Sequence, residues 1–248
     1  MKAQGTNFDS EFNLQVNQKT LSLKKPVVMG VLNLTPDSFY DGGTLQSETD
    51  LLAKAEKYIK EGASILDIGA VSTKPNAAKV IENEELARLL PALKLLRKTF
   101  ANIFISVDSY RSEVARVAAN EGADIINDIS GGTFDTDMLA TMGRLNLPYV
   151  MMHTQGTPQT MQQNPQYKNV VSDVFDFFAQ QTKIAQQNGI EQLILDVGFG
   201  FGKTVEHNYE LLAQLKKFEA FKSPLLAGVS RKSMINKVIG SKPVPRNS

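Results

Sequence analysis

The sequence predicts an α/β fold, a (β/α)8 TIM barrel that is incomplete at its C-terminus and carries a short N-terminal β-hairpin. Seven short apolar runs rich in β-forming residues recur along the chain, and segments with helical periodicity lie between them. No Gly/Ser-rich linker and no run of charges divides this alternation, so a single domain over residues 1–248 is expected. An open, doubly wound sheet is the alternative arrangement of the same elements.

The first expected element is a hairpin over residues 12–23, where apolar and polar side chains alternate around a polar centre. With it, residues 1–24 form an N-terminal extension that could plug the bottom of the barrel. The later runs lack strict alternation, which is typical of parallel strands buried on both faces. These strands are expected over residues 27–34, 64–68, 103–107, 124–126, 148–152, 193–195 and 225–229. Helices are expected over residues 48–61, 83–98, 112–121, 170–188 and 205–215, and a shorter one over 232–239.

An eighth strand is not evident after residue 229. Only the short helical stretch and the polar tail SKPVPRNS follow. Because a closed barrel needs every strand of its ring, we expect the barrel to be incomplete in this chain.

Composition excludes several classes of protein. The chain has 248 residues, a net charge of +1 and no cysteine, so neither disulfides nor cysteine-bearing zinc sites are possible. The near-zero charge gives no basic surface for nucleic acid, and no apolar run approaches the roughly 20 residues that span a bilayer. We therefore expect a cytoplasmic protein that binds neither nucleic acid nor membranes. With only two histidines, any bound metal is expected to be Mg²⁺ on oxygen ligands.

Polar side chains stand at the carboxyl end of almost every predicted strand. In a barrel these ends converge on one face, where active sites of this architecture are built. Helix capping is the alternative explanation for any single position, but several of these residues precede any cap position. A ring of hydrogen-bonding groups around a planar, nitrogen-rich ligand explains the set better. Its members are Asn33, Asp67, Asp108, Asn127, Asp128, His153, Asp196 and the run from Ser230 to Lys232.

Two phosphate-binding patterns fail. Val197 stands where a P-loop needs its first glycine, and Lys203 stands where a dinucleotide fingerprint needs its third. Lys232 leaves three interpretations open, namely a Schiff-base nucleophile, a group that binds an anion or carbonyl, and a solvent-facing lysine at a helix start. Its neighbour Arg231 and the nearby serine hydroxyls favour the second.

Seven ordered motifs together resemble those of the dihydropteroate synthase family. They cover nearly the whole chain, and their order and spacing carry the resemblance. The motifs are GVLNLTPDSF with DGG at residues 30–43, ILDIG with STKP at 65–75, SVDS at 106–109, INDISGG at 126–132, MHTQG at 152–156, DVGFGFGK at 196–203 and GVSRKS at 228–233.

The resemblance implies a transferase of folate biosynthesis. It would join 6-hydroxymethyl-7,8-dihydropterin diphosphate to p-aminobenzoate, with Mg²⁺ as cofactor, as a homodimer and as a sulfonamide target. Asn33, Asp108 and Lys232 correspond to catalytic positions, and Asn33 to the one that meets Mg²⁺. The implied pterin contacts are Asp108, Asn127, Ile129, Met152, Asp196, Gly200, Phe201, Gly228 and Lys232. The implied p-aminobenzoate and loop positions are Phe39, Thr73, Lys74, Pro75, Phe201, Ser230, Arg231 and Ser233.

Two departures from the family pattern affect the expected activity. After the second strand the family usually has Gly-Glu-Ser-Thr-Arg-Pro, whereas residues 70–75 read AVSTKP, so a bidentate guanidinium becomes the point charge of Lys74. The family's Arg-x-His pair on the eighth strand has no counterpart after Lys232. We therefore expect weak or absent turnover from this chain alone, with pterin binding retained. A pterin-binding protein with little turnover and a pterin-dependent methyltransferase are the alternatives.

Overall fold

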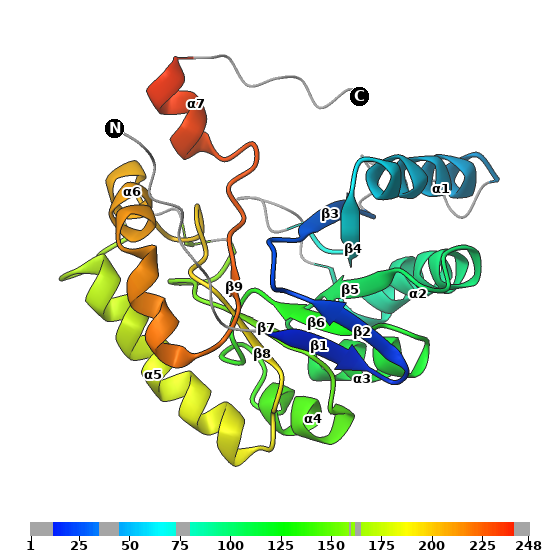
Figure 1. Ribbon diagram of the computed structural model, residues 1–248, viewed down its shortest axis with the longest axis horizontal. Helices are drawn as coiled ribbons and strands as arrows, with labels where there is room; N and C mark the ends of the chain where they lie inside the picture. The colour runs from blue at the N-terminus through cyan, green and yellow to red at the C-terminus, as the bar shows by residue number, and fades with distance from the viewer. Residues whose placement is uncertain (1–11, 35–44, 73–79, 159, 162–164, 241–248) are drawn as a thin grey trace.

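Seven parallel strands form one curled sheet in chain order, with helices α1 to α6 along its outer side (Figure 1). The computed structural model describes residues 12–34, 45–72, 80–158, 160–161 and 165–240. The fold class predicted from the sequence is confirmed. The strands are β3 (Val28–Asn33), β4 (Ala63–Gly69), β5 (Phe104–Asp108), β6 (Ile125–Asp128), β7 (Tyr149–Met152), β8 (Leu193–Asp196) and β9 (Leu225–Leu226).

Helices connect successive strands as expected, with two additions, α4 and η1. They are α1 (Leu45–Lys60), α2 (Glu82–Thr99), α3 (Ser112–Asn120), α4 (Met138–Leu145), α5 (Val170–Gln187), α6 (Val205–Ala213), the 3-10 helix η1 (Leu215–Phe221) and α7 (Ser233–Ile239). The sequence did not predict α4, because glycine at position 143 lowers helix propensity. Packing requires that glycine, since a Cβ there would lie 1.7 Å from the carbonyl oxygen of Asn188.

The last strand is shorter than predicted. Pairing of β9 to β8 covers only Leu225 and Leu226, although the apolar run extends to Val229. In the strand order β3 and β9 lie at opposite edges of the sheet, so within the described residues the barrel is open between them, as expected.

An N-terminal hairpin covers the amino ends of the strands, as the alternating pattern predicted. Its strands are β1 (Asn13–Val16) and β2 (Lys19–Ser22), and Asn17 turns the chain with φ of 53°. The hairpin side chains Leu14 and Val16 are buried in an apolar cluster inside the barrel. The cluster's other buried members are Ile65, Phe104, Ile125, Val150 and Ile194.

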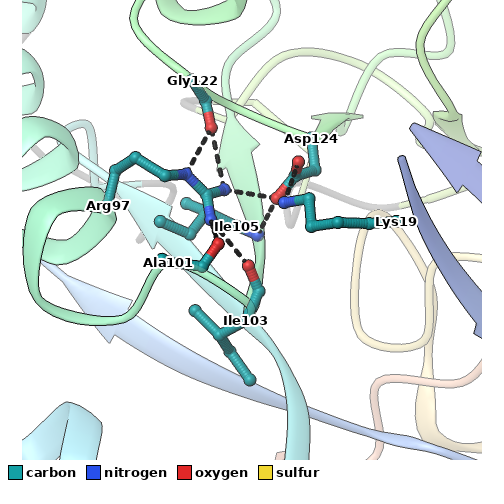
Figure 2. Close-up of polar contacts among 7 residues, drawn as sticks. All are labelled: Lys19, Arg97, Ala101, Ile103, Ile105, Gly122 and Asp124. Atoms are coloured by element: carbon teal, nitrogen blue, oxygen red, sulfur yellow. Dashed lines mark hydrogen bonds and ion pairs between the residues drawn. The ribbon is translucent and has the colours of Figure 1, made fainter. Parts of the chain in front are cut away.

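A charged network anchors this hairpin to the barrel (Figure 2). The Asp124 carboxylate pairs with Lys19 of the hairpin and with Arg97 of α2, and it accepts the backbone N–H of Ile105 at 2.9 Å. The remaining N–H groups of Arg97 donate to three backbone carbonyls, those of Ala101, Ile103 and Gly122. One buried carboxylate thus joins the hairpin, α2 and the sheet.

No membrane-crossing segment occurs among the helices of the described residues, since none is both long enough and apolar enough.

Candidate functional site

Strand register brings the predicted polar residues together at the carboxyl end of the sheet. Asn33 pairs with Gly69, Gly69 with Asp108 and Asp108 with Asn127, while Met152 pairs with Asp196. Side chains alternate along a strand, and the residues two or four positions earlier on β4 to β8 belong to the buried cluster under the hairpin. The side chains at these strand ends therefore share the inner face of the barrel.

Beneath this rim lies a buried carboxylate, Asp67, which the sequence placed in the ring of polar residues without giving it a role of its own. Asp67 is only 4% exposed and accepts the Ser106 hydroxyl at 2.6 Å. The Asn127 side-chain amide donates to both oxygens of Asp67, at 3.4 and 3.3 Å. Burial raises the pKa of Asp67 to about 6, although both hydrogen-bond partners lower it.

Asp108 follows Ser106 by two residues on β5 and lies one layer above the paired residues Asp67 and Ser106. Burial raises its pKa well above the ordinary value, and the neighbouring carboxylates of Asp67 and Asp128 raise it further. Gly69 leaves room for it, because a Cβ at that position would lie 3.2 Å from the Asp108 Cβ. An acid in this environment gains from a ligand that donates hydrogen bonds or carries positive charge.

Across the rim, Asp196 and Lys232 form a second charged group. Asp196 is buried and accepts the Gly198 N–H at 2.8 Å, and burial raises its pKa to about 6 against the opposing effect of Lys232. Burial lowers the pKa of Lys232, and Asp196 opposes this shift. The Lys232 ammonium nitrogen lies 4.2 Å from the ring centroid of Phe201, within cation–π range. Gly200 has φ of 82°, and a Cβ there would lie 3.1 Å from the Lys232 side chain.

A buried lysine holds the loop that carries Gly200 and Phe201. Lys203 is 4% exposed, and its ammonium group donates to the carbonyls of His153 at 3.2 Å, Gly198 at 3.0 Å and Phe201 at 2.9 Å. Burial lowers its pKa to about 7. Sequence reasoning missed this role, because the three acceptors come from two separate segments that only the fold brings together.

Two polar residues at the strand ends have structural roles. The Asp128 carboxylate accepts hydrogen bonds from Tyr149 at 2.6 Å, Ser130 at 2.7 Å and the Gly132 N–H at 2.8 Å, and so shapes the loop after β6. His153 is buried edge-on against Phe177, with ring centroids 4.9 Å apart. Burial lowers the pKa of His153 to about 2, so it stays neutral at physiological pH.

Other predicted site residues fall into three groups. Ile129, directly after β6, and Met152, at the end of β7, are buried, yet they belong to neither apolar cluster. Asn33 is exposed at the end of β3, and Gly228, Ser230 and Arg231 are exposed after β9. Phe39, Thr73, Lys74 and Pro75 lie outside the described residues, and Ser233 begins α7.

A metal site built entirely from protein side chains is not found in the described part of the chain. No group of three or more histidine, cysteine, aspartate or glutamate residues there could hold an ion. Asn33 offers a single exposed side-chain carbonyl on the inner face. An amide oxygen is a type of ligand that Mg²⁺ accepts, and this ion often takes only one or two protein ligands.

A profile of the family described as "Pterin binding enzyme" matches residues 29–247. The dihydropteroate synthase of Haemophilus influenzae is 49% identical over 233 residues, covering 93% of this chain and 84% of that protein. The Escherichia coli K12 dihydropteroate synthase is 46% identical over 231 residues, covering 92% of this chain and 81% of that protein.

Solved structures agree with these sequence matches. A Yersinia pestis dihydropteroate synthase with a sulfonamide drug complex has a TM-score of 0.85 and 40% identity, over 94% of this chain and 84% of that one. The Xanthomonas albilineans dihydropteroate synthase with 4-aminobenzoic acid has a TM-score of 0.85 and 37% identity, over 94% and 83%. The same enzyme in complex with 7,8-dihydropteroate has a TM-score of 0.81 and 35% identity, over 93% and 82%.

Proposed function

Because this chain belongs to the dihydropteroate synthases, within the family of pterin-binding enzymes, we propose that it joins a pterin to p-aminobenzoate. The substrate would be 6-hydroxymethyl-7,8-dihydropterin diphosphate, and the products 7,8-dihydropteroate and diphosphate. The arrangement of three polar side chains supports the proposal that the reaction takes place at this site. Asp108, Asn127 and Asp196 share the inner rim of the barrel, and burial raises the pKa of both acids.

This rim suits the donor-rich edge of a pterin ring. Carboxylates that accept ring N–H groups form strong charge-assisted hydrogen bonds and reject analogues that lack those donors. Ile129 and Met152 would pack against the ring, and Lys232, which lies near Asp196, would bond the pterin. Gly200 and Phe201 would form the edge of the pocket beside Lys232, and Gly228 would contact the pterin as its place in the family motif implies.

In the proposed reaction the bond between the pterin methylene carbon and the diphosphate oxygen breaks first. The electron pair leaves with diphosphate, and the positive charge spreads over the pterin ring. The aniline nitrogen of p-aminobenzoate then attacks the methylene carbon and loses a proton to solvent. Asp108 would stabilise the cationic ring, so catalysis here is positioning and electrostatic stabilisation without a covalent enzyme intermediate.

Mg²⁺ is part of the proposal, with Asn33 as its protein ligand. When bound, the ion would neutralise negative charge on the departing diphosphate. Phe39, Thr73, Lys74, Pro75, Ser230, Arg231 and Ser233 are proposed to border p-aminobenzoate, as their places in the family motifs imply. Sulfonamides would compete at this second subsite. A cytoplasmic location and a homodimer complete the proposal, and light scattering during size-exclusion chromatography tests the dimer.

Diphosphate release, measured with and without p-aminobenzoate and with and without Mg²⁺, tests the reaction. Calorimetric titration with the pterin diphosphate measures binding separately. Release that depends on both p-aminobenzoate and Mg²⁺ is the expected result. Pterin binding without release would instead identify a pterin-binding protein with little turnover. Failure to bind p-aminobenzoate would favour the methyltransferase alternative.

A further inference from the structure

We propose that Asp67 is a positioning residue that holds the side-chain amide of Asn127 with its oxygen facing the pocket. The inference deepens the proposed function and rests on it. It assigns a role to a buried carboxylate that lies one layer below the residues expected to touch the pterin.

The strand register places Asp67 beneath the rim. Asp67 pairs with Ser106, while two residues further along the same strands Gly69 pairs with Asp108 and Asp108 with Asn127. Alternation along each strand puts these two layers on the same inner face, one above the other. Asp67 therefore lies under the rim, where a ligand seated on Asp108 and Asn127 would not reach it.

Hydrogen bonding then selects one orientation of the amide. An ionised carboxylate only accepts hydrogen bonds, whereas the asparagine amide has an NH2 that donates and an oxygen that accepts. The NH2 of Asn127 donates to both oxygens of Asp67, at 3.4 and 3.3 Å. With the amide reversed, its oxygen would face the carboxylate, and two acceptors would oppose each other in a buried site.

The surroundings reinforce this choice. The Ser106 hydroxyl is fully buried and donates its proton to Asp67 at 2.6 Å, so this proton is not available to the Asn127 amide. The Asn127 main chain is fixed as well, because its carbonyl accepts the Ser109 N–H at 3.0 Å. With a pKa of about 6, Asp67 is mostly ionised at neutral pH.

The consequence is a rim that presents acceptors. The Asn127 oxygen joins the carboxylates of Asp108 and Asp196, so the site is built for a ligand whose edge donates at all three. Specificity for a ring edge rich in N–H groups would depend on Asp67 even though Asp67 does not touch that ring.

Asp67→Asn tests the inference, because it reverses the hydrogen bonding beneath Asn127 at nearly constant volume. The new amide accepts the Ser106 hydroxyl with its oxygen and turns its own NH2 toward Asn127. Asn127 must then offer its oxygen downward and its NH2 to the pocket. Calorimetric titration with 6-hydroxymethyl-7,8-dihydropterin diphosphate is expected to show about 10- to 100-fold weaker binding, the effect of opposing like groups in a buried hydrogen bond.

A double-mutant cycle separates positioning from other effects. In an Asn127→Ala background no amide remains to be oriented, so Asp67→Asn is expected to change affinity by less than about threefold, the precision at which such cycles resolve coupling. Loss of charge beside Asp108, or general damage to the fold, would persist in that background. If Asp67→Asn does not fold, Asp67→Ala replaces it in the cycle, with a loss of about tenfold expected for a missing buried partner.

Equal losses in both backgrounds, or no loss in either, would overturn the inference while wild-type binding upholds the proposed function. Failure of the wild-type protein to bind the pterin diphosphate would overturn both. Thermal unfolding of each variant provides the control for folding.

Discussion

Replacing Asp124 with alanine is expected to destabilise the protein by about 3 kcal/mol, a value built from the hydrogen-bond and ion-pair costs below. The carboxylate of Asp124 is the common partner of Lys19, Arg97 and the Ile105 N–H (Figure 2). Its side chain is 4% exposed, and alanine would leave all three partners without their shared acceptor. The hairpin would lose its charged attachment to the barrel.

The size of the effect depends on whether each former partner of Asp124 can bind water or another acceptor. Removing one member of a buried ion pair costs about 3–5 kcal/mol when the other charge stays buried. The side chains of Lys19 and Arg97 are 23% and 21% exposed, so water reaches both, and Arg97 keeps its carbonyl partners. The ionic part therefore falls to about 2 kcal/mol, below the range for fully buried pairs. The unpaired Ile105 N–H adds about 1 kcal/mol.

Thermal unfolding measures the effect. For a chain of this length 1 kcal/mol corresponds to about 2–4 °C, so Tm is expected to fall by about 6–12 °C. Asp124→Asn keeps an acceptor for Ile105 and should fall between the wild type and Asp124→Ala. The control is Glu56→Ala, whose carboxylate pairs with Lys60 at 2.9 Å on an exposed helix surface and should cost at most about 0.5 kcal/mol. A Tm for Asp124→Ala as close to wild type as that of Glu56→Ala would refute the reasoning.

Three further predictions concern the site. Gly200→Ala is expected to weaken pterin diphosphate binding about tenfold, because a side chain at positive φ is strained and this one would displace Lys232. Gly189→Ala is its matched control, with φ of 80° and nothing within 4 Å, and should lose stability without losing affinity; equal affinity losses would exclude the Lys232 contact as the cause. Asp108→Asn is expected to raise Tm at pH 8 relative to wild type while weakening pterin binding. The pKa of Asp108 is raised in the folded state, so protonation of this acid stabilises the fold. That stabilisation is complete below the ordinary pKa of 3.8 and is lost as pH rises through the folded pKa. The gain in Tm should therefore be larger at pH 8 than at pH 5, and the opposite order would contradict the assignment. Lys203→Met keeps the buried shape but removes the ammonium donor from the carbonyls of His153 and Phe201, while the Gly198 carbonyl still accepts the Phe201 N–H at 3.1 Å. Tm should fall by the equivalent of about 2 kcal/mol, and limited proteolysis should cut the chain between residues 198 and 202. Resistance to cleavage equal to wild type would show that the loop does not depend on this lysine.

The alternation of strands with helices predicted much of the fold, and the polar residues at the carboxyl ends of the strands predicted the rim. Once β5, β6 and β8 were placed, Asp108, Asn127 and Asp196 had to face one another at the carboxyl ends of the sheet. The hairpin was also evident, because its two-residue period differs from everything after it. These features depend on local sequence and on general rules for parallel sheets.

The layer beneath the rim could not be predicted in the same way. The role of Asp67 depends on the register among β4, β5 and β6, which no single segment specifies. Lys203 acts on carbonyls, and backbone acceptors leave no trace in side-chain identity. Glycine at position 143 reads as a helix breaker until the close approach of Asn188 is known.

Acidic side chains lie near both ends of β5 and β6, and the charged groups around them differ between the two ends. At the amino end, Asp124 is matched by two cations and a backbone amide, so its charge is balanced within the protein. At the carboxyl end, Asp108 has the acids Asp67 and Asp128 for neighbours, and its pKa is raised by burial and by these carboxylates. At the amino end of these strands the paired charge of Asp124 stabilises the fold. At the carboxyl end the ionised form of Asp108 is unfavourable, and a donor-rich or cationic ligand would stabilise it. A unit of pKa shift corresponds to about 1.4 kcal/mol, so restoring the ionised form of even one such acid is a substantial part of a binding free energy. A donor-rich or cationic ligand would add a partner for Asp108 at one end, while at the other end the charge of Asp124 is already paired within the fold.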